Sequence, residues 1–174
     1  MYPDVILLNG TGSSGKTSLA KELQELLNHQ YLNFSIDSVL YALPPSDLQH
    51  MMAGRPIERD GFDYAQLVKG YHHSVRALLE TGCRVIIDNA WIDKAEVDAL
   101  NLILSGFDVV RVQVECDLAI CEAREHARGD RAIGLAKWEF PQVHQHMHYD
   151  TSINTSCLSP AEAAARLHDW LKQR

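Results

Sequence analysis

One run of eight residues near the N-terminus limits the folds available to this chain. Residues 10–17 match the phosphate-binding pattern GxxxxGK[ST] at every fixed position. The apolar residues 5–8 precede the run, and leucines at helical spacing follow it. Strand, loop and helix in this order form the context that such a loop requires. We therefore predict a buried strand that delivers the loop to the N-terminus of a helix. The run reads Gly10, Thr11, Gly12, Ser13, Ser14, Gly15, Lys16 and Thr17.

Each residue type in this loop suits phosphate chemistry. Glycines let successive backbone N–H groups turn toward phosphate oxygens. Lys16 supplies a positive charge for the β- and γ-phosphates, and the Thr17 hydroxyl can ligate Mg²⁺. We predict that all eight residues bind ATP and that Mg²⁺ accompanies it. The alternative is a glycine-rich turn that matches by chance, and the motif alone does not separate a kinase from an ATPase or a switch.

The rest of the chain alternates short apolar runs with amphipathic segments. Strands are predicted at 5–8, 31–36, 85–87, 109–114 and 151–155. Helices are predicted at 19–27, 67–79, 95–104, 117–126 and 137–148, with a last helix that a capping box opens at Ser159. Such alternation requires parallel strands joined by crossover helices, which predicts a three-layer α/β sandwich. With 174 residues and neither repeats nor a linker, residues 1–174 are expected to form one domain.

The composition of the chain disfavours two classes of partner, nucleic acids and membranes. The net charge of −7 disfavours nucleic acid, which normally requires a basic face. None of the apolar runs approaches the length of about 20 residues that spans a membrane, so no membrane partner is expected. The first residues lack the basic segment of a signal peptide, which favours a cytoplasmic location. The four cysteines show no CxxC spacing and are expected to be buried small apolar residues.

Two aspartates follow predicted strands. Asp37 comes after the second strand, where a carboxylate can take the proton of an attacking hydroxyl group. It could equally cap a helix that begins at Ser38. Asp88 follows the third strand, where an aspartate commonly holds Mg²⁺. Its alternative is a turn residue that ends the strand, but the phosphate loop favours the metal role.

A basic cluster stands out in this acidic chain. Arg124, Arg128 and Arg131 fall within eight positions. Guanidinium groups suit phosphate oxygens, and a mobile lid that carries them, at about residues 124–136, could close over the transferred group. The alternative is a solvated helix end whose glutamates and aspartate pair with the arginines. For Arg124 the two alternatives are nearly equal.

Several histidines and tryptophans have other possible roles. His144, His146 and His148 could ligate a metal, but a histidine-bearing surface is the commoner reason for such a pattern. Trp138 is expected to be ordinary packing. Trp91, shortly after Asp88, could line a substrate pocket.

Taken together, these segments resemble the chloramphenicol 3-O-phosphotransferase family. The matching segments keep their order and spacing from residue 6 to about residue 150. The loop is shared by many proteins, whereas the Asp-Ser pair at 37–38 and the Ala-Arg-Gly-Asp-Arg run at 127–131 are more particular. The segments are the phosphate loop, residues 35–38, 82–88, 116–117, 122–134, 143–144 and 149–150.

The resemblance implies an adenylate-kinase-like P-loop kinase fold with a central five-stranded parallel sheet. It also implies transfer of phosphate from ATP to a hydroxyl of a small molecule, such as chloramphenicol or a related hydroxylated antibiotic. Asp37 then stands at the position of the general base, Lys16 contacts the phosphates, and Arg128 and Arg131 lie in the lid. The acceptor pocket would be lined by residues 39–41 and the segment through Tyr64. Its apolar and aromatic content suits an uncharged aromatic acceptor, whereas Arg55 and Arg59 would suit an anionic one.

Two departures and two alternatives accompany the resemblance. Asn89 stands where a second acidic residue would be expected, and residues 44–63 do not match the family's pattern. One alternative is a P-loop kinase for another small metabolite, such as a sugar acid, a nucleoside or a shikimate-like compound. The other is a non-enzymatic, nucleotide-dependent switch, which would need no carboxylate beside the γ-phosphate.

Overall fold

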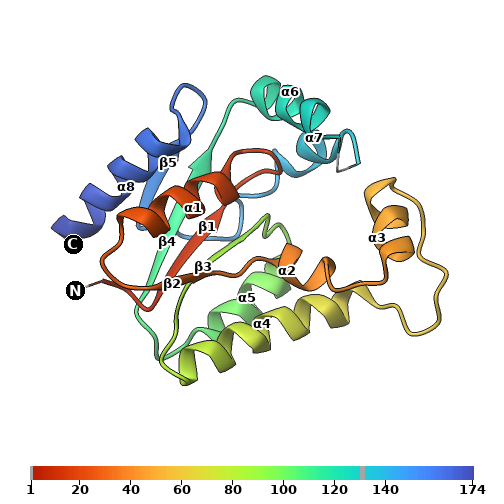
Figure 1. Ribbon diagram of the computed structural model, residues 1–174, viewed down its shortest axis with the longest axis horizontal. Coiled ribbons are helices and arrows are strands. Elements are labelled where there is room, and N and C mark those ends of the chain that lie inside the picture. Colours follow the sequence, from red (N-terminus) through yellow and green to blue (C-terminus); the bar gives the residue numbers. More distant parts are fainter. Residues whose placement is uncertain (1, 130–131) are drawn as a thin grey trace.

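Within the part of the chain that the structure describes, five parallel strands form the central sheet (Figure 1). The computed structural model describes residues 2–129 and 132–174. The strands are β1 (Val5–Asn9), β2 (Tyr31–Asn33), β3 (Arg84–Asn89), β4 (Val109–Glu115) and β5 (Thr151–Asn154), in the spatial order β2-β3-β1-β4-β5. The helices are α1 (Lys16–Leu26), α2 (Ile36–Leu40), α3 (Pro45–Met52), α4 (Tyr64–Glu80), α5 (Lys94–Ile103), α6 (Leu118–Arg128), α7 (Leu135–Glu139) and α8 (Pro160–Gln173).

Helices cover both faces of the sheet, so the predicted three-layer sandwich with five parallel strands is confirmed. On one face, α1 and α8 bury Leu19, Leu23 and Leu167 against the strands. On the opposite face, α4 and α5 do so with residues such as Tyr71 and Leu100 (Figure 1). The central strand β1 is fully buried, because helices pack on both of its faces.

Strand register brings the polar strand ends together. In the parallel pairing of β1 with β3, Leu8 lies opposite Asp88 and Asn9 lies opposite Asn89. The phosphate loop begins immediately after Asn9. Because all strands are parallel, their carboxyl ends meet at one edge of the sheet, where ligands of this architecture bind.

The second strand is shorter than predicted. It ends at Asn33, and residues 34–36, which were expected to extend it, instead lead into α2. Ser35 has an extended backbone and is the N-cap residue, so Ile36 is the first residue of the helix. The apolar character of residues 31–36 indicated a strand, but Ile36 is buried as part of a helix.

Three other expectations are corrected. The helix predicted at 137–148 is only the five-residue α7, followed by turns, because Pro141 cannot continue a helix. Within residues 44–63, where no element was predicted, α3 begins with Pro45 in its first turn. Cys116 and Cys121 are buried as expected, whereas Cys157 is exposed.

The capping box predicted at Ser159 is present, because the Ser159 hydroxyl accepts from Glu162 N–H and the Glu162 carboxylate accepts from Ser159 N–H. Among the residues that the structure describes, none of the helices is both long enough and apolar enough to cross a membrane.

Candidate active site

The phosphate loop has the tight backbone that its glycines predicted. Gly15 has φ 91° and precedes α1 as its N-cap residue, so a side chain there would be strained. Gly10 is required for a different reason, since a Cβ atom at this position would lie 2.4 Å from the Val114 carbonyl oxygen of β4. Ser13 also has a positive φ, of 61°, which the sequence did not indicate.

Lys16 lies back across the loop. Its Nζ donates to the carbonyl oxygens of Gly10 at 2.6 Å and Thr11 at 2.9 Å, and the residue is almost entirely buried. The Thr155 hydroxyl, which directly follows β5, donates to the Ser14 carbonyl oxygen at 2.6 Å. These contacts hold the loop between its own lysine and the neighbouring edge of the sheet.

A small, polar cavity, here called the phosphate cavity, lies beside this loop. Its volume is about 80 Å³. Thr17 and Asp88 both line it. Their hydroxyl and carboxylate oxygens are ligands of the kind that Mg²⁺ prefers. The lining residues are therefore chemically suited to a phosphate chain and its Mg²⁺. They are Gly12, Ser13, Gly15, Lys16, Thr17, Ser18, Ile36, Asp37, Asp88, Asn89, Ala90, Arg128 and Glu139.

A second cavity, here called the α8 cavity, continues along α1 on the side of α8. Its volume is about 430 Å³, and it shares Ser13, Gly15, Ser18 and Arg128 with the phosphate cavity. The rest of its lining is mainly apolar, and comes from residues of α1, α6 and α8 and the segment before α8. These residues are Leu19, Arg124, Ala127, Thr155, Leu158, Ser159, Pro160 and Ala163.

A third cavity, here called the apolar cavity, opens on the other side of the phosphate cavity. Its volume is about 390 Å³, which suits a drug-sized molecule. Leu40, Tyr41, Tyr64 and three residues of α3 line it, as predicted, whereas Val39 is not among the lining residues and the residues of α7 were not predicted. The described lining is Ile36, Asp37, Leu40, Tyr41, Leu48, Met51, Met52, Tyr64, Asn89, Ala90, Ile92, Glu96, Ala132, Leu135, Trp138 and Glu139.

Asp37 lies where the phosphate and apolar cavities meet. It belongs to the first turn of α2 and lines both cavities. Neither placement considered from the sequence is correct: Asp37 does not close β2, and the N-cap residue is Ser35. The first turn of a helix nevertheless suits a negative charge, because the N–H groups there favour it.

Glu139 is a site residue that the sequence did not reveal. It is the last residue of α7, and its Oε2 accepts from the Gly12 N–H at 2.5 Å. It lines both the phosphate cavity and the apolar cavity. The Glu139 carboxylate therefore accepts a hydrogen bond from a backbone N–H group that could otherwise bind a phosphate oxygen.

The arginines of the basic cluster have different surroundings. Arg124 Nη2 donates to the Thr155 carbonyl oxygen at 3.0 Å, and Arg124 lines the α8 cavity. Arg128 is the last residue of α6 and lines both the α8 and phosphate cavities. Arg131, the third predicted member, lies outside the described residues.

Glu125, one of the glutamates that the alternative for this cluster placed at a solvated helix end, is buried. Its buried carboxylate accepts from the backbone N–H groups of Gly134 at 2.7 Å and Ala136 at 2.9 Å. It therefore ties the start of α7 to α6.

Asn9 joins three segments at the base of the site. Its Oδ1 accepts from the Trp91 N–H at 2.9 Å, and its Nδ2 donates to the Val143 carbonyl oxygen at 2.7 Å and the Tyr149 hydroxyl at 2.8 Å. The end of β1 is thereby tied to the segment after β3 and to the turns after α7.

The roles considered for two tryptophans are exchanged. Trp91 is 1% exposed and does not line the apolar cavity, so its indole belongs to the core. Trp138, which was expected to be ordinary packing, is 57% exposed and does line that cavity. Only the tertiary structure distinguishes the two.

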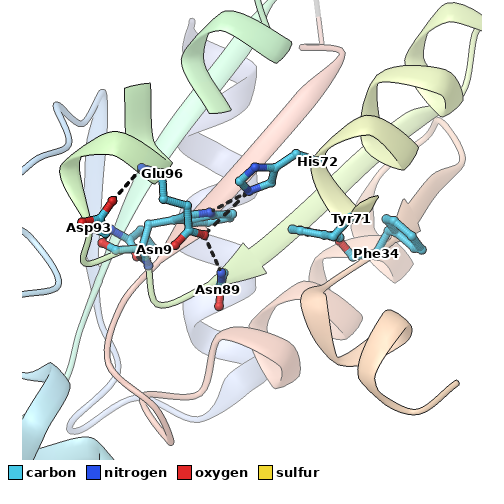
Figure 2. A network of polar contacts seen from close by, with 8 residues as sticks. Asn9, Phe34, Tyr71, His72, Asn89, Asp93 and Glu96 are labelled. Atoms are coloured by element: carbon cyan, nitrogen blue, oxygen red, sulfur yellow. Dashed lines mark hydrogen bonds and ion pairs between the residues drawn. The ribbon is translucent and has the colours of Figure 1, made fainter. Parts of the chain in front are cut away.

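Glu96, near the start of α5, places another carboxyl group in the wall of the apolar cavity. Asn89 Nδ2 lies 3.5 Å from Glu96 Oε1, and His72 Nε2 lies 3.8 Å from the same oxygen (Figure 2). Burial, with a smaller contribution from Asp93, raises the pKa of Glu96 to about 7. Burial also lowers the pKa of His72 to about 4, so His72 is neutral at pH 7.

The histidines of the segment after α7 have separate environments. His144 Nδ1 lies 2.8 Å from the Tyr149 hydroxyl, and burial lowers the pKa of His144. The segment is not helical, so the helical spacing considered for His144 and His148 does not apply. Across residues 2–129 and 132–174, the structure contains no group of three His, Cys, Asp or Glu side chains that could hold a metal ion.

Two sequence comparisons with known proteins bear on the family of this chain. The sequence profile of the chloramphenicol phosphotransferase-like proteins matches residues 3–172. A protein of Mycobacterium tuberculosis that carries the provisional name O-phosphotransferase is 32% identical over 183 aligned positions, which cover 95% of this chain and 80% of that protein.

Solved structures share the fold at lower sequence identity. APS kinase of Mycobacterium tuberculosis, solved with AMPPNP and APS, has a TM-score of 0.71 at 18% identity, with 99% of each chain covered. The tunicamycin resistance protein of Deinococcus radiodurans has a TM-score of 0.68 at 19% identity, covering 98% of this chain and 96% of that one. A gluconokinase from Sinorhizobium meliloti has a TM-score of 0.65 at 17% identity, covering 99% and 97%.

The profile match spans nearly the whole sequence. The compared kinase structures share its overall fold. This chain therefore belongs to the chloramphenicol phosphotransferase-like family and is a phosphotransferase built on the P-loop kinase fold.

Proposed function

We propose that this protein transfers the γ-phosphoryl group of ATP to a hydroxyl of a small molecule in the cytoplasm, and that the acceptor is chloramphenicol or a related hydroxylated antibiotic. The ATP phosphates would lie on the loop from Gly10 to Thr17, and the nucleoside would lie in the α8 cavity. The acceptor would fill the apolar cavity, whose aromatic and aliphatic lining suits an uncharged aromatic molecule.

The position of Asp37 between two cavities carries this proposal. A hydroxyl in the apolar cavity and a phosphate in the phosphate cavity would both lie next to Asp37, which belongs to the lining of each. Asp37 would accept the hydroxyl proton as the oxygen attacks phosphorus. The new O–P bond forms while the bond from the γ-phosphorus to the bridging oxygen breaks, and ADP leaves.

The other proposed roles follow from charge. Lys16 would turn from the loop carbonyls toward the β- and γ-phosphates, and Thr17 and Asp88 would hold Mg²⁺. When bound, Mg²⁺ supplies charge that neutralises the phosphate oxygens. Arg128, together with Arg131 of the predicted lid, would stabilise charge on the transferred group. Much of the rate would come from positioning the two reactants and excluding water.

A direct assay tests the reaction. The protein is incubated with ATP, Mg²⁺ and chloramphenicol, and mass spectrometry follows the acceptor for the gain of about 80 Da that a phosphoryl group adds. Gluconate, shikimate and a nucleoside are tested in parallel, because a kinase for another metabolite would modify one of these instead. Release of ADP that no acceptor stimulates would favour a nucleotide switch.

Asp37→Asn tests the general base. We expect ATP affinity to be nearly unchanged and kcat to fall by roughly 10²–10⁴, the usual contribution of general-base catalysis. The matched control is Asp98→Asn, which removes an exposed carboxylate from α5 that pairs with Lys94. Full turnover by Asp37→Asn would contradict the assigned role.

A further inference from the structure

Glu96 occupies a helix position where glutamate normally serves as a cap, but its carboxyl group is used elsewhere. It stands three residues after Asp93, the N-cap residue of α5. In a complete capping box the third residue reaches back to the cap, as Glu162 does for Ser159 in α8. In α5 the Glu96 N–H donates to Asp93 Oδ1, whereas the Glu96 carboxyl group extends to Asn89 (Figure 2).

The surroundings of this carboxyl group supply little hydrogen bonding. Asn89 is 3.5 Å away, at the limit of a hydrogen bond. His72 Nε2 accepts from the Trp91 indole N–H at 3.3 Å, so in neutral His72 this nitrogen does not also donate to Glu96. The Glu96 side chain remains 23% exposed, and the residue lines the apolar cavity.

The described lining of the apolar cavity carries one sign of charge. Asp37, Glu96 and Glu139 contribute carboxyl groups, and the described lining residues include no lysine, arginine or histidine. The remainder is mainly aliphatic and aromatic. A negatively charged molecule bound beside Glu96 would be repelled by its ionised carboxylate, because the surrounding walls are apolar and screen charge poorly.

We propose that Glu96 is a specificity-determining residue of the acceptor site. Its carboxyl group receives a hydrogen-bond donor of the acceptor, a hydroxyl, amide N–H or ammonium group other than the hydroxyl that is phosphorylated. It thereby selects uncharged or cationic alcohols over those that carry a carboxylate, sulfate or phosphate group. This inference rests on the proposed function and names the chemical class of its acceptor.

Three probes with one carbon skeleton test the inference by binding. Phenylpropanediol is uncharged, phenylalaninol is a cation and phenyllactate is an anion. Their dissociation constants are measured by NMR for the wild type, Glu96→Gln, Glu96→Asp and the control Asp98→Asn. Transfer of phosphate to each probe and to chloramphenicol is measured separately, together with ATP affinity.

The wild type should bind phenylalaninol and phenylpropanediol more tightly than phenyllactate. Glu96→Gln should reduce the preference for phenylalaninol over phenyllactate by about tenfold, since a charge-assisted hydrogen bond becomes a neutral one. Glu96→Asp should retain part of that preference. Asp98→Asn should keep all of it, and ATP affinity should be unchanged in every variant.

The two proposals can fail separately. Binding with the expected preference but no phosphate transfer to any compound would contradict the proposed function and leave the role of Glu96 supported. A preference that Glu96→Gln does not change, tighter binding of phenyllactate, or no binding of either phenylalaninol or phenylpropanediol would overturn the inference.

Discussion

Glu96→Gln should stabilise the protein above pH 7 and have little effect near pH 4.5. Burial raises the pKa of Glu96 from 4.5 to about 7. Between these pH values the folded chain keeps a proton that the unfolded chain has released, so stability falls as pH rises. Above pH 7 the group is ionised in both states, and the full free-energy cost of burying its charge lowers the stability of the folded state. Below pH 4.5 it is protonated in both and the cost is absent.

The magnitude follows from the same two pKa values. Their separation corresponds to about 3 kcal/mol, at about 1.4 kcal/mol for each tenfold change in proton affinity. Because the side chain is only 23% exposed, solvent screening removes little of this cost. Glutamine keeps the shape of the protonated side chain and never ionises, so the variant should recover most of the difference at alkaline pH.

Urea unfolding at intervals of about one pH unit, from about pH 4.5 to about pH 8.5, measures the effect. The free energy of unfolding of Glu96→Gln minus that of the wild type should rise across this range. The lowered pKa of His72, about 4, makes both proteins less stable in acid. This contribution of His72 to the free energy of unfolding largely cancels in the difference between the two proteins. Asp98→Asn should give a flat difference. A flat difference for Glu96→Gln as well would refute the reasoning, because burial would then impose no cost on the ionised group.

Three further predictions concern the phosphate loop. Lys16→Ala should weaken ATP binding and abolish phosphate transfer, and equilibrium binding with a fluorescent nucleotide checks this; an active variant would refute the role. Glu139→Gln should tighten ATP binding by about tenfold, because a charged competitor for a loop N–H is replaced by a neutral one; calorimetry that finds equal or weaker binding would contradict it. Gly10→Ala should lower the free energy of unfolding by about 3 kcal/mol, because the added methyl group clashes with Val114. As a control, Gly70→Ala within α4 meets no neighbour and should be neutral or slightly stabilising. Equal unfolding curves for the two variants would contradict the clash.

Features that depend on neighbouring residues were predictable from the sequence. The phosphate loop is a contiguous motif whose geometry follows from its glycines, and the Ser159 capping box spans four residues. Apolar runs located the strands because a strand buried on both faces must be apolar throughout. Asp88 was placed near the loop because the ends of parallel strands meet at one edge of the sheet.

Local patterns were insufficient where helix and strand compete over few residues. The apolar residues between Tyr31 and Ile36 satisfied a strand pattern, but the extended Ser35 begins a helix and carries Asp37 into its first turn. The segment before Tyr64 has weak periodicity, and its helix α3 was missed. Its methionines lie in the segment that was expected to line the acceptor pocket, and they do help to form the apolar cavity, although local pattern did not predict their helix.

By itself, the sequence determined the class of fold, the place of the phosphate loop and the presence of carboxylates near it, since each depends on short-range pattern. The tertiary structure alone decided which carboxylates share a cavity. Glu139 reaches Gly12 across 127 positions of the chain, and Glu96 faces the apolar cavity instead of closing its own capping box. Such contacts depend on how helices from distant segments pack around one sheet edge, and residue spacing does not predict that packing.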